Sequence, residues 1–148
     1  MGKRREGREA AVQFLVYCDL NQGAGPATAE GFWELRPASK AIRDFALNLV
    51  EGVVQHRTET DERISRYAEN YELGRLAVVD RNILRLAIYE MLFRHDIPPV
   101  VSINEAIEIA KRFGTEESSR FVNGILDRVK LDLTRPLRTA ASSGDAAR

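Results

Sequence analysis

The sequence contains few of the residues that disulfide-bonded, membrane-bound or metal-dependent proteins need. Its 148 residues include one cysteine, Cys18, and two histidines. A single cysteine cannot form an internal disulfide, which favours a reducing, cytoplasmic setting. No apolar run approaches the roughly 20 residues of a membrane span, and no apolar signal-peptide segment follows the charged N-terminus. We therefore expect a cytoplasmic protein that is not held in a membrane.

The motifs of common enzymes are also missing. The two histidines, His56 and His95, are far apart and lack the spacing of a zinc site. The sequence has no GxxxxGK[ST] phosphate loop, no GxGxxG turn after a strand and no HExxH helix. Carboxylate pairs such as Glu116 and Glu117 suit the first turn of a helix better than acid–base catalysis. We predict a binding protein rather than an enzyme, with no cofactor and no metal.

The formal net charge is zero, because 22 Lys and Arg residues balance 22 Asp and Glu residues. This balance excludes a uniformly basic chromatin-type protein, but it hides an uneven distribution. Residues 1–17 carry +2, residues 18–110 carry −5, residues 111–130 carry +2 and residues 131–148 carry +1. Eighteen of the basic residues are arginines, which suit phosphate oxygens and stack on bases. The two basic stretches either form helix faces that are exposed to water or bind an anionic partner.

Helix-forming patterns extend through most of the chain, and no segment has a convincing strand pattern. We predict an all-α protein of six or seven helices. The expected N-caps are Ser39, Thr58, Ser102 and Thr115, and Gly114 is the expected C-cap of the preceding helix. The predicted helices cover residues 8–20, 32–34, 39–54, 58–67, 79–93, 102–113 and 115–133. The fifth of these is apolar over more than half its circumference, as expected of a central, buried helix.

One side of the first predicted helix has residues that suit single-stranded RNA. Gln13 and Tyr17 are four positions apart and share that side, and Arg5 continues the line toward the N-terminus. Arginines hold phosphates, an amide reads a base edge and an aromatic ring stacks on a base. Arg120 and Phe121 offer a similar pair on the last helix. The alternative is that both rings pack in the core and the amide is merely solvated.

Three segments resemble one known family. The stretch DIPPVVSINEAIEIAKRFGTEESSRFVNGILDRV, residues 96–129, closely resembles the C-terminal signature of the NusB transcription antitermination factors. Residues 80–92, DRNILRLAIYEML, are similar to the family's central helix. Residues 4–15, RREGREAAVQFL, are similar to its arginine-rich first helix. The resemblance covers residues 4–130, which is nearly the whole part expected to fold.

The resemblance implies two small helical bundles packed across each other. With it, we divide the chain into a flexible arginine-rich arm at residues 1–7, a single NusB-like helical domain at residues 8–133 and a disordered tail at residues 134–148. It also implies that the two basic ends of the sequence meet in one RNA surface.

The function implied by the resemblance is RNA binding without catalysis. NusB proteins bind the boxA element of nascent ribosomal RNA together with NusE, a ribosomal small-subunit protein. The complex joins elongating RNA polymerase with other Nus factors and suppresses premature, mainly Rho-dependent, termination. Family members form monomers or homodimers, which leaves the oligomeric state of this chain open.

The family's functional positions can be carried over onto this sequence. Asp80 occupies a position that is typically acidic in the family and belongs to the surface for NusE, and the acidic middle of the chain suits a basic partner. The implied RNA contacts are Arg4, Arg5, Arg8, Gln13, Glu117, Arg120 and Phe121.

The first helix departs from the family at one aromatic position. Many relatives have tyrosine where this chain has Val16, and Tyr17 follows one residue later. A shift of one residue rotates a side chain by about 100° around a helix. Tyr17 either replaces the RNA-facing ring or points to the core. We include Tyr17 among the predicted RNA contacts and predict that Tyr17→Ala weakens boxA binding and leaves the melting temperature unchanged.

Three other functions remain as alternatives. An RNA-modifying enzyme with a NusB-like domain would need a long α/β region, for which these residues have no room. A DNA-binding regulator would need a helix-turn-helix pattern, which we do not find. A helical adaptor that binds NusE but no RNA is distinguished from the antitermination factor by titration with boxA RNA.

Overall fold

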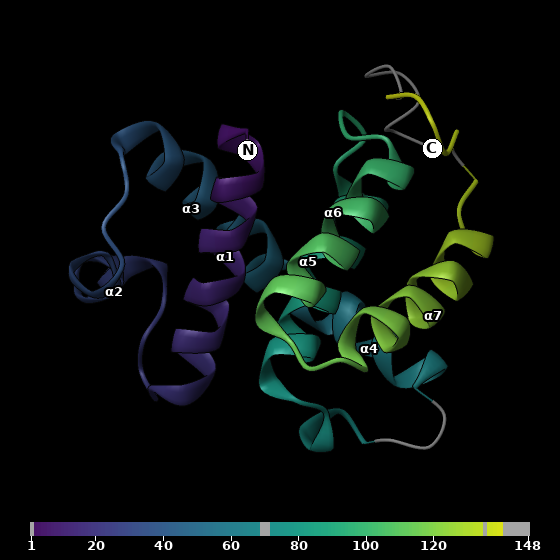
Figure 1. Cartoon of the computed structure of the whole chain (residues 1–148), viewed down its shortest axis with the longest axis horizontal. Helices are drawn as coiled ribbons and strands as arrows, with labels where there is room; N and C mark the ends of the chain where they lie inside the picture. The colour runs from purple at the N-terminus through teal and green to yellow at the C-terminus, as the bar shows by residue number, and fades with distance from the viewer. Residues whose placement is uncertain (1, 69–71, 135, 141–148) are drawn as a thin grey trace. The chain divides into compact units, whose positions relative to one another are not determined.

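The computed structural model describes residues 2–68, 72–134 and 136–140. Within these ranges the chain forms seven α-helices and two short 3-10 helices and no β-strand, which confirms the all-α prediction (Figure 1). The chain divides into two compact units, Met1–Gln55 and His56–Arg148. The helices are α1 (Lys3–Leu20), η1 (Pro26–Thr28), α2 (Ala29–Leu35) and α3 (Lys40–Gln55) in the first unit, and α4 (Arg57–Tyr67), η2 (Leu73–Arg75), α5 (Val78–Phe93), α6 (Pro99–Phe113) and α7 (Ser118–Leu131) in the second.

Helices α1 and α3 pack against each other and supply most of the core of the first unit. Their apolar residues recur at spacings of three and four, which places them on one side of each helix. At Gly7 the backbone of α1 lies against a side chain of α3, because an added Cβ would lie 2.3 Å from Cδ1 of Phe45. The ring of Phe45 therefore fills the space that a side chain at position 7 would need. The fully buried side chains of this core are Ala10, Ala11, Phe14, Ala46, Leu49 and Val50.

Helix α1 begins at Lys3, five residues before the predicted start at Arg8. Residues 3–7, which we expected to form a flexible arm, are helical in the structure. The residues before Gly7 are good helix formers, and they continue the helix toward the N-terminus. Glycine weakens a helix interior by about 0.5–1 kcal/mol relative to alanine, but the contact with Phe45 offsets this cost.

Helix α2 is held to α1 by a cluster of aromatic rings. The ring of Phe32 lies 4.8 Å from that of Phe14 and 4.9 Å from that of Trp33, both edge-on. Tyr17 joins the cluster, with its ring centroid 5.6 Å from that of Phe32. Edge-on and tilted aromatic pairs contribute about 0.5–1.5 kcal/mol beyond the apolar area that they bury. The short helix expected around residues 32–34 is thereby confirmed and extended to seven residues.

Helix α5 is the centre of the second unit and contacts α4, α6 and α7. Its side chains are buried on nearly every side from Asn82 to Met91, which confirms the central helix expected from its apolar pattern. The surrounding helices have narrower apolar sides that face it. The deepest side chains of this core are Ile64, Ile83, Leu84, Ile88, Met91, Ile109 and Leu126.

Two buried polar contacts connect α5 to its neighbours. Arg85 donates from Nε and Nη2 to the two carboxylate oxygens of Asp61 on α4, at 2.7 and 3.2 Å. Its Nη1 also donates to Oδ1 of Asn82 at 3.1 Å. On the side of α6, the hydroxyl of Ser102 donates to Glu90 at 2.6 Å. The buried side chains of Arg85 and Glu90 thus each have a polar partner on a neighbouring helix, which offsets the cost of their burial.

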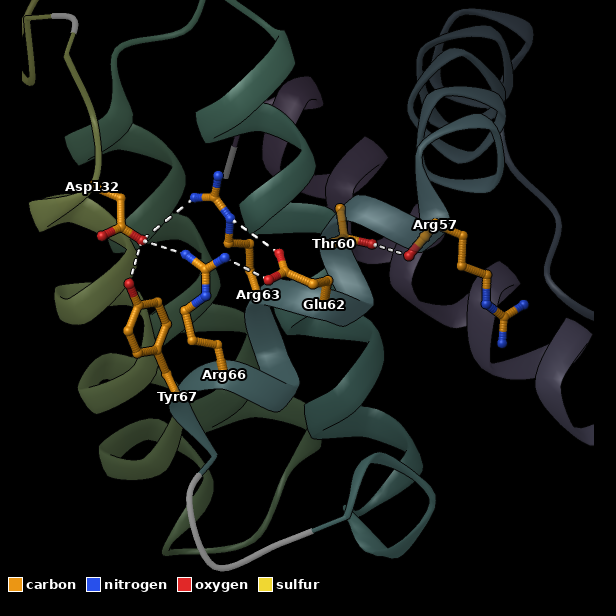
Figure 2. A network of polar contacts seen from close by, with 7 residues as sticks. All are labelled: Arg57, Thr60, Glu62, Arg63, Arg66, Tyr67 and Asp132. Carbon is orange, nitrogen blue, oxygen red and sulfur yellow. Dashed lines mark hydrogen bonds and ion pairs between the residues drawn. The ribbon is translucent and has the colours of Figure 1, made fainter.

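The end of α7 is attached to α4 through one carboxylate. Asp132 accepts a hydrogen bond from the hydroxyl of Tyr67 (Figure 2). The same carboxylate pairs with Arg63 at 3.4 Å and with Arg66 at 3.8 Å. Hydrogen bonds with Tyr67 and Glu62 raise the pKa of Arg66 above its ordinary value. We refer to Arg63, Arg66, Tyr67 and Asp132 as the Asp132 clamp.

Two of the predicted helix caps are confirmed. The Oγ of Ser39 accepts a hydrogen bond from the backbone N–H of Ile42 at 3.3 Å, as an N-cap of α3 should. Gly114 is the C-cap of α6, and its N–H donates to the carbonyl oxygen of Ala110 at 2.9 Å. These caps define one end of each helix from local sequence alone.

The other three predicted N-caps are wrong. Helix α6 begins at Pro99, because proline suits the first turn of a helix, so Ser102 lies inside the helix. Thr58 also lies inside its helix, since α4 begins one residue earlier. Helix α7 begins at Ser118, so Thr115 lies three residues before the helix. The backbone N–H of Thr115 donates a hydrogen bond to Oγ of Ser118 at 2.9 Å. The hydroxyl of Ser118 therefore organises the turn before α7.

The predicted disordered tail is only partly described. Residues 136–140 have no regular secondary structure. The carbonyl oxygen of Leu137 nevertheless accepts a hydrogen bond from the N–H of Val100 at 2.9 Å, near the start of α6. Residues 135 and 141–148 lie outside the described residues.

Candidate nucleic-acid interface

The three predicted arginines of the first unit differ in exposure. Arg4 is exposed and Arg5 is half-buried, on the first turn of α1. Arg8 is only 5% exposed, and its guanidinium carbon lies 5.9 Å from the centroid of the Phe45 ring. A guanidinium over a ring is held by the charge distribution of that ring. The prediction of Arg8 as a phosphate contact is therefore not supported, and its side chain stabilises the packing of α1 on α3.

Gln13 is engaged by a residue that the sequence did not indicate. Arg36, which follows α2, donates from Nε to Oε1 of Gln13 at 2.6 Å. The two residues are far apart in sequence, so no local spacing could predict the contact. The bond fixes the amide of Gln13 and brings a guanidinium to this side of α1. Arg36 therefore joins Gln13 as a candidate RNA contact.

Tyr17 lies against the aromatic rings of α1 and α2 and keeps part of its surface exposed. Its ring is half-buried and lies 5.6 Å from the ring of Phe32 and 6.3 Å from that of Phe14. An added Cβ at Gly31 on α2 would lie 3.3 Å from the tyrosine hydroxyl. Because the ring packs between α1 and α2, the expectation of an unchanged melting temperature for Tyr17→Ala is replaced by a loss of stability.

The second unit brings four predicted residues to one surface pocket of about 380 Å³. The pocket lies between the segment that leads into α5 and the start of α7. Glu117 and Arg120 are 79% and 87% exposed at their side chains, and their charged groups are 4.0 Å apart. Phe121 is half-buried beside them. The lining residues are Arg75, Leu76, Ala77, Asp80, Glu117, Arg120 and Phe121, which we call the α5–α7 pocket.

Asp80, which we predicted for a protein partner, is buried in this pocket. Asp80 is 8% exposed, and its Oδ1 has no hydrogen-bond partner among the described residues. Arg75 and Leu76, which the sequence analysis missed, stand beside it. Local spacing does not reveal them, because η2 meets the start of α7 only in the folded unit.

The described residues offer binding groups rather than catalytic ones. No group of three or more His, Cys, Asp or Glu among them could hold a metal ion. No helix in the described ranges is long and apolar enough to cross a membrane. Arginines, an amide and an aromatic ring occupy exposed or half-buried positions, and such groups bind phosphates and bases. Fold and surface together define an all-helical binding protein.

Comparison with known proteins gives the particular family. The NusB family matches residues 5–130. The transcription antitermination protein NusB of Geobacter sulfurreducens is 52% identical over 130 residues, which cover 87% of this chain and 94% of the relative. The chain belongs to the NusB family.

Two solved structures agree with this assignment. The structure of T. maritima NusB has a TM-score of 0.79 and 42% identity, and the match covers 89% of this chain and 93% of that one. A crystal structure of the antitermination factors NusB and NusE in complex with dsRNA has a TM-score of 0.76 and 28% identity, covering 88% and 98%. Membership of a family of antitermination proteins confirms the prediction that the chain is not an enzyme.

Proposed function

We propose that this protein is an RNA-binding antitermination factor that binds boxA of nascent ribosomal RNA together with NusE. The observation that carries the proposal is the α5–α7 pocket, in which Phe121 stands beside the exposed Arg120. An aromatic ring next to a guanidinium suits an unstacked base and its phosphate. The crystal structure of a related NusB with NusE and dsRNA supports both kinds of partner.

The first unit contributes a second group of RNA contacts. Arg4 is exposed at the start of α1, Arg5 is half-buried, and Arg36 is bonded to Gln13 farther along the helix. Residues 1–17 and 111–130 each carry a charge of only +2. Phosphate contacts contribute in proportion to their number, so we expect modest RNA affinity for the protein alone.

The partner protein raises this affinity in our proposal. Residues 18–110 carry a net charge of −5, which complements a basic ribosomal protein such as NusE. The resulting complex joins RNA polymerase and other Nus factors in the cytoplasm and supports processive elongation. A homodimer, if it forms, competes with this assembly for the same protein.

Titration of labelled boxA RNA tests the proposal. The protein, alone and with NusE, is mixed with boxA or a scrambled RNA at several salt concentrations. We expect boxA to be preferred and the affinity to fall with salt, more steeply in the presence of NusE than for the protein alone. Arg120→Gln should weaken binding and reduce the slope of log K against log salt by about one. Lys40→Gln, which removes the same charge from an 82% exposed side chain of the first unit, is the matched control.

Each result of the titration has a definite meaning. Equal binding of boxA and scrambled RNA, even with NusE, would reject the antitermination function. NusE binding without any RNA binding would support the helical adaptor instead. Equal effects of Arg120→Gln and Lys40→Gln would mean that the α5–α7 pocket is not part of the RNA surface.

A further inference from the structure

The Asp132 clamp gathers positive charge around one carboxylate. Arg63 and Arg66 lie about one turn apart on α4, and both guanidiniums point at Oδ2 of Asp132 (Figure 2). A third guanidinium, that of Arg128 on α7, donates to a backbone carbonyl oxygen at the end of α4 at 3.5 Å. Glu62 is the other carboxylate of this surface and pairs with both arginines of α4. Three positive groups therefore meet two negative ones, which leaves an excess of one positive charge.

The two guanidiniums of α4 have more donors than their partners use. A guanidinium carries five N–H donors on three nitrogens. Arg63 uses Nη1 for Asp132 and Nε for Glu62. Arg66 uses Nη1 and Nη2 for the same two carboxylates. The distances to Asp132 are 3.4 and 3.8 Å, longer than the roughly 2.7–2.9 Å of a strong charge-assisted hydrogen bond. Asp132 therefore occupies these donors without using their full capacity.

Asp132 also has an unfavourable position at the end of α7. It is the C-cap of that helix, where the unpaired carbonyl groups carry partial negative charge. This end of a helix favours a cation and repels a carboxylate. The contacts with α4 offset the repulsion, and all of them are made by a single oxygen, Oδ2. An anion that is not fixed to a helix end takes the same donors without this cost.

A phosphate group suits these donors better than a carboxylate does. Its oxygens accept hydrogen bonds from several directions, so two guanidiniums and the hydroxyl of Tyr67 can each meet a different oxygen. The side chains of Arg66 and Asp132 are 47% and 29% exposed, so an anion reaches them from solvent. Asp132 follows Arg120 by twelve residues, which is about 18 Å along a helix. The clamp is therefore separate from the α5–α7 pocket.

We propose that the Asp132 clamp is a phosphate-binding site, in which a phosphate group displaces the carboxylate of Asp132. The phosphate then accepts hydrogen bonds from Arg63, Arg66 and the hydroxyl of Tyr67. Its source is the backbone of RNA or a free phosphate. A backbone phosphate would extend the RNA surface along α7, and that case rests on the proposed function, whereas a site for free phosphate does not. Asp132 acts as an internal competitor that lowers the affinity of the site.

The test uses the full-length protein and two probes, inorganic phosphate and a labelled oligouridine. The Nε–H signals of the arginines in NMR spectra report phosphate binding, and fluorescence anisotropy reports RNA binding. Acetate at equal ionic strength is the carboxylate probe. We expect phosphate to shift the signals of Arg63 and Arg66 saturably and acetate to shift them much less, because acetate has only two oxygens for three donors.

Asp132→Asn removes the internal competitor and keeps the shape of the side chain. We expect both probes to bind about fivefold more tightly, since the repulsion between two unit charges about 4 Å apart in water is worth a factor of this size. Asp127→Asn makes the same charge change on α7, at a side chain that is 52% exposed, and is the matched control. It should change either affinity by less than about twofold, because salt screens the more distant charge.

Arg66→Gln removes a donor instead of the competitor. It should weaken the binding of phosphate and of oligouridine, and it should reduce the slope of log K against log salt for the RNA by about one. Lys40→Gln, at an 82% exposed side chain of the first unit, is the matched control and should leave phosphate binding unchanged.

The outcomes separate the clamp from the proposed function. Tighter binding of both probes by Asp132→Asn would support the site and identify the RNA backbone as a source of the phosphate. Tighter binding of inorganic phosphate alone would support a site for free phosphate and leave the RNA-binding function untouched. Equal effects of Asp132→Asn and Asp127→Asn would overturn the inference, as would equal shifts with acetate and phosphate. Absence of boxA binding by the unmodified protein would reject the proposed function, whatever the phosphate titration gives.

Discussion

Substitution of Tyr17 distinguishes an aromatic ring that packs from one that is displayed for RNA. The ring lies in the aromatic cluster between α1 and α2, against Phe14 and Phe32. Removal of a fully buried aromatic ring costs about 3–5 kcal/mol, so a half-buried ring should cost about 2 kcal/mol. For a protein of this size, 1 kcal/mol lowers Tm by about 2–4 °C. Tyr17→Ala should therefore lower Tm by about 4–8 °C.

The assay combines unfolding with RNA titration on the same preparations. Circular dichroism gives Tm, and anisotropy at fixed salt gives the affinity for boxA RNA. Tyr17→Phe keeps the ring and should match the wild-type protein in both measurements. Val16→Ala, at the neighbouring half-buried position, controls for general loss of packing on α1. At temperatures where Tyr17→Ala is fully folded, its RNA affinity should stay within about twofold of wild type, because the ring packs against α2. A ring that stacked on a base would instead contribute about 1–3 kcal/mol to RNA binding, and its loss would lower the affinity by more than twofold.

One result would refute the packing argument. If Tyr17→Ala melts with the wild-type protein and binds boxA RNA tenfold or more weakly, the ring is displayed for RNA and its contact with Phe32 contributes little. A loss of both stability and affinity at low temperature would assign the ring to both roles.

Three more predictions follow from the contacts of the second unit and from its charges. Asp61→Ala should cost about 3–5 kcal/mol in urea denaturation, because it removes the carboxylate that neutralises the buried Arg85 guanidinium. Arg85→Met should cost less, because Asp61 is partly exposed to water, and the reverse order would contradict this. Gly114→Ala should destabilise by about 1–3 kcal/mol despite its better helix propensity, because the new Cβ would lie 2.3 Å from Oγ of Ser118, and a thermal melt equal to or above wild type would disprove it. RNA affinity should show a small slope with salt for the protein alone and a steeper one with NusE, and identical slopes would argue against added phosphate contacts.

The helices could be predicted from sequence because their signals are local. Apolar residues at spacings of three and four gave α3, α5, α6 and α7, and Ser39 and Gly114 gave correct caps. The errors occurred where two local signals competed. Ser102 resembles an N-cap, but Pro99 can start a helix three residues earlier, and Ser102 then bonds to Glu90 on another helix.

The candidate site was less predictable, because its contacts are not local. The buried position of Arg8 depends on Phe45 of α3, and the orientation of Gln13 depends on Arg36. Periodicity identifies the side of a helix but not the side chain that covers it. The family resemblance indicated Phe121 and Asp80 separately, and only the folded second unit brings them into one pocket.

The Asp132 clamp has a consequence for how the second unit opens. Helix ends normally fray and exchange their amide hydrogens quickly. The clamp holds the last turn of α7 to α4, so the end of α7 should open only when α4 detaches from it (Figure 2). Amides near the end of α7 and on α4 should then exchange at similar, slow rates. A fusion partner attached after the clamp should leave α7 undisturbed, whereas a chain cut before Asp132 should expose both helices to proteases.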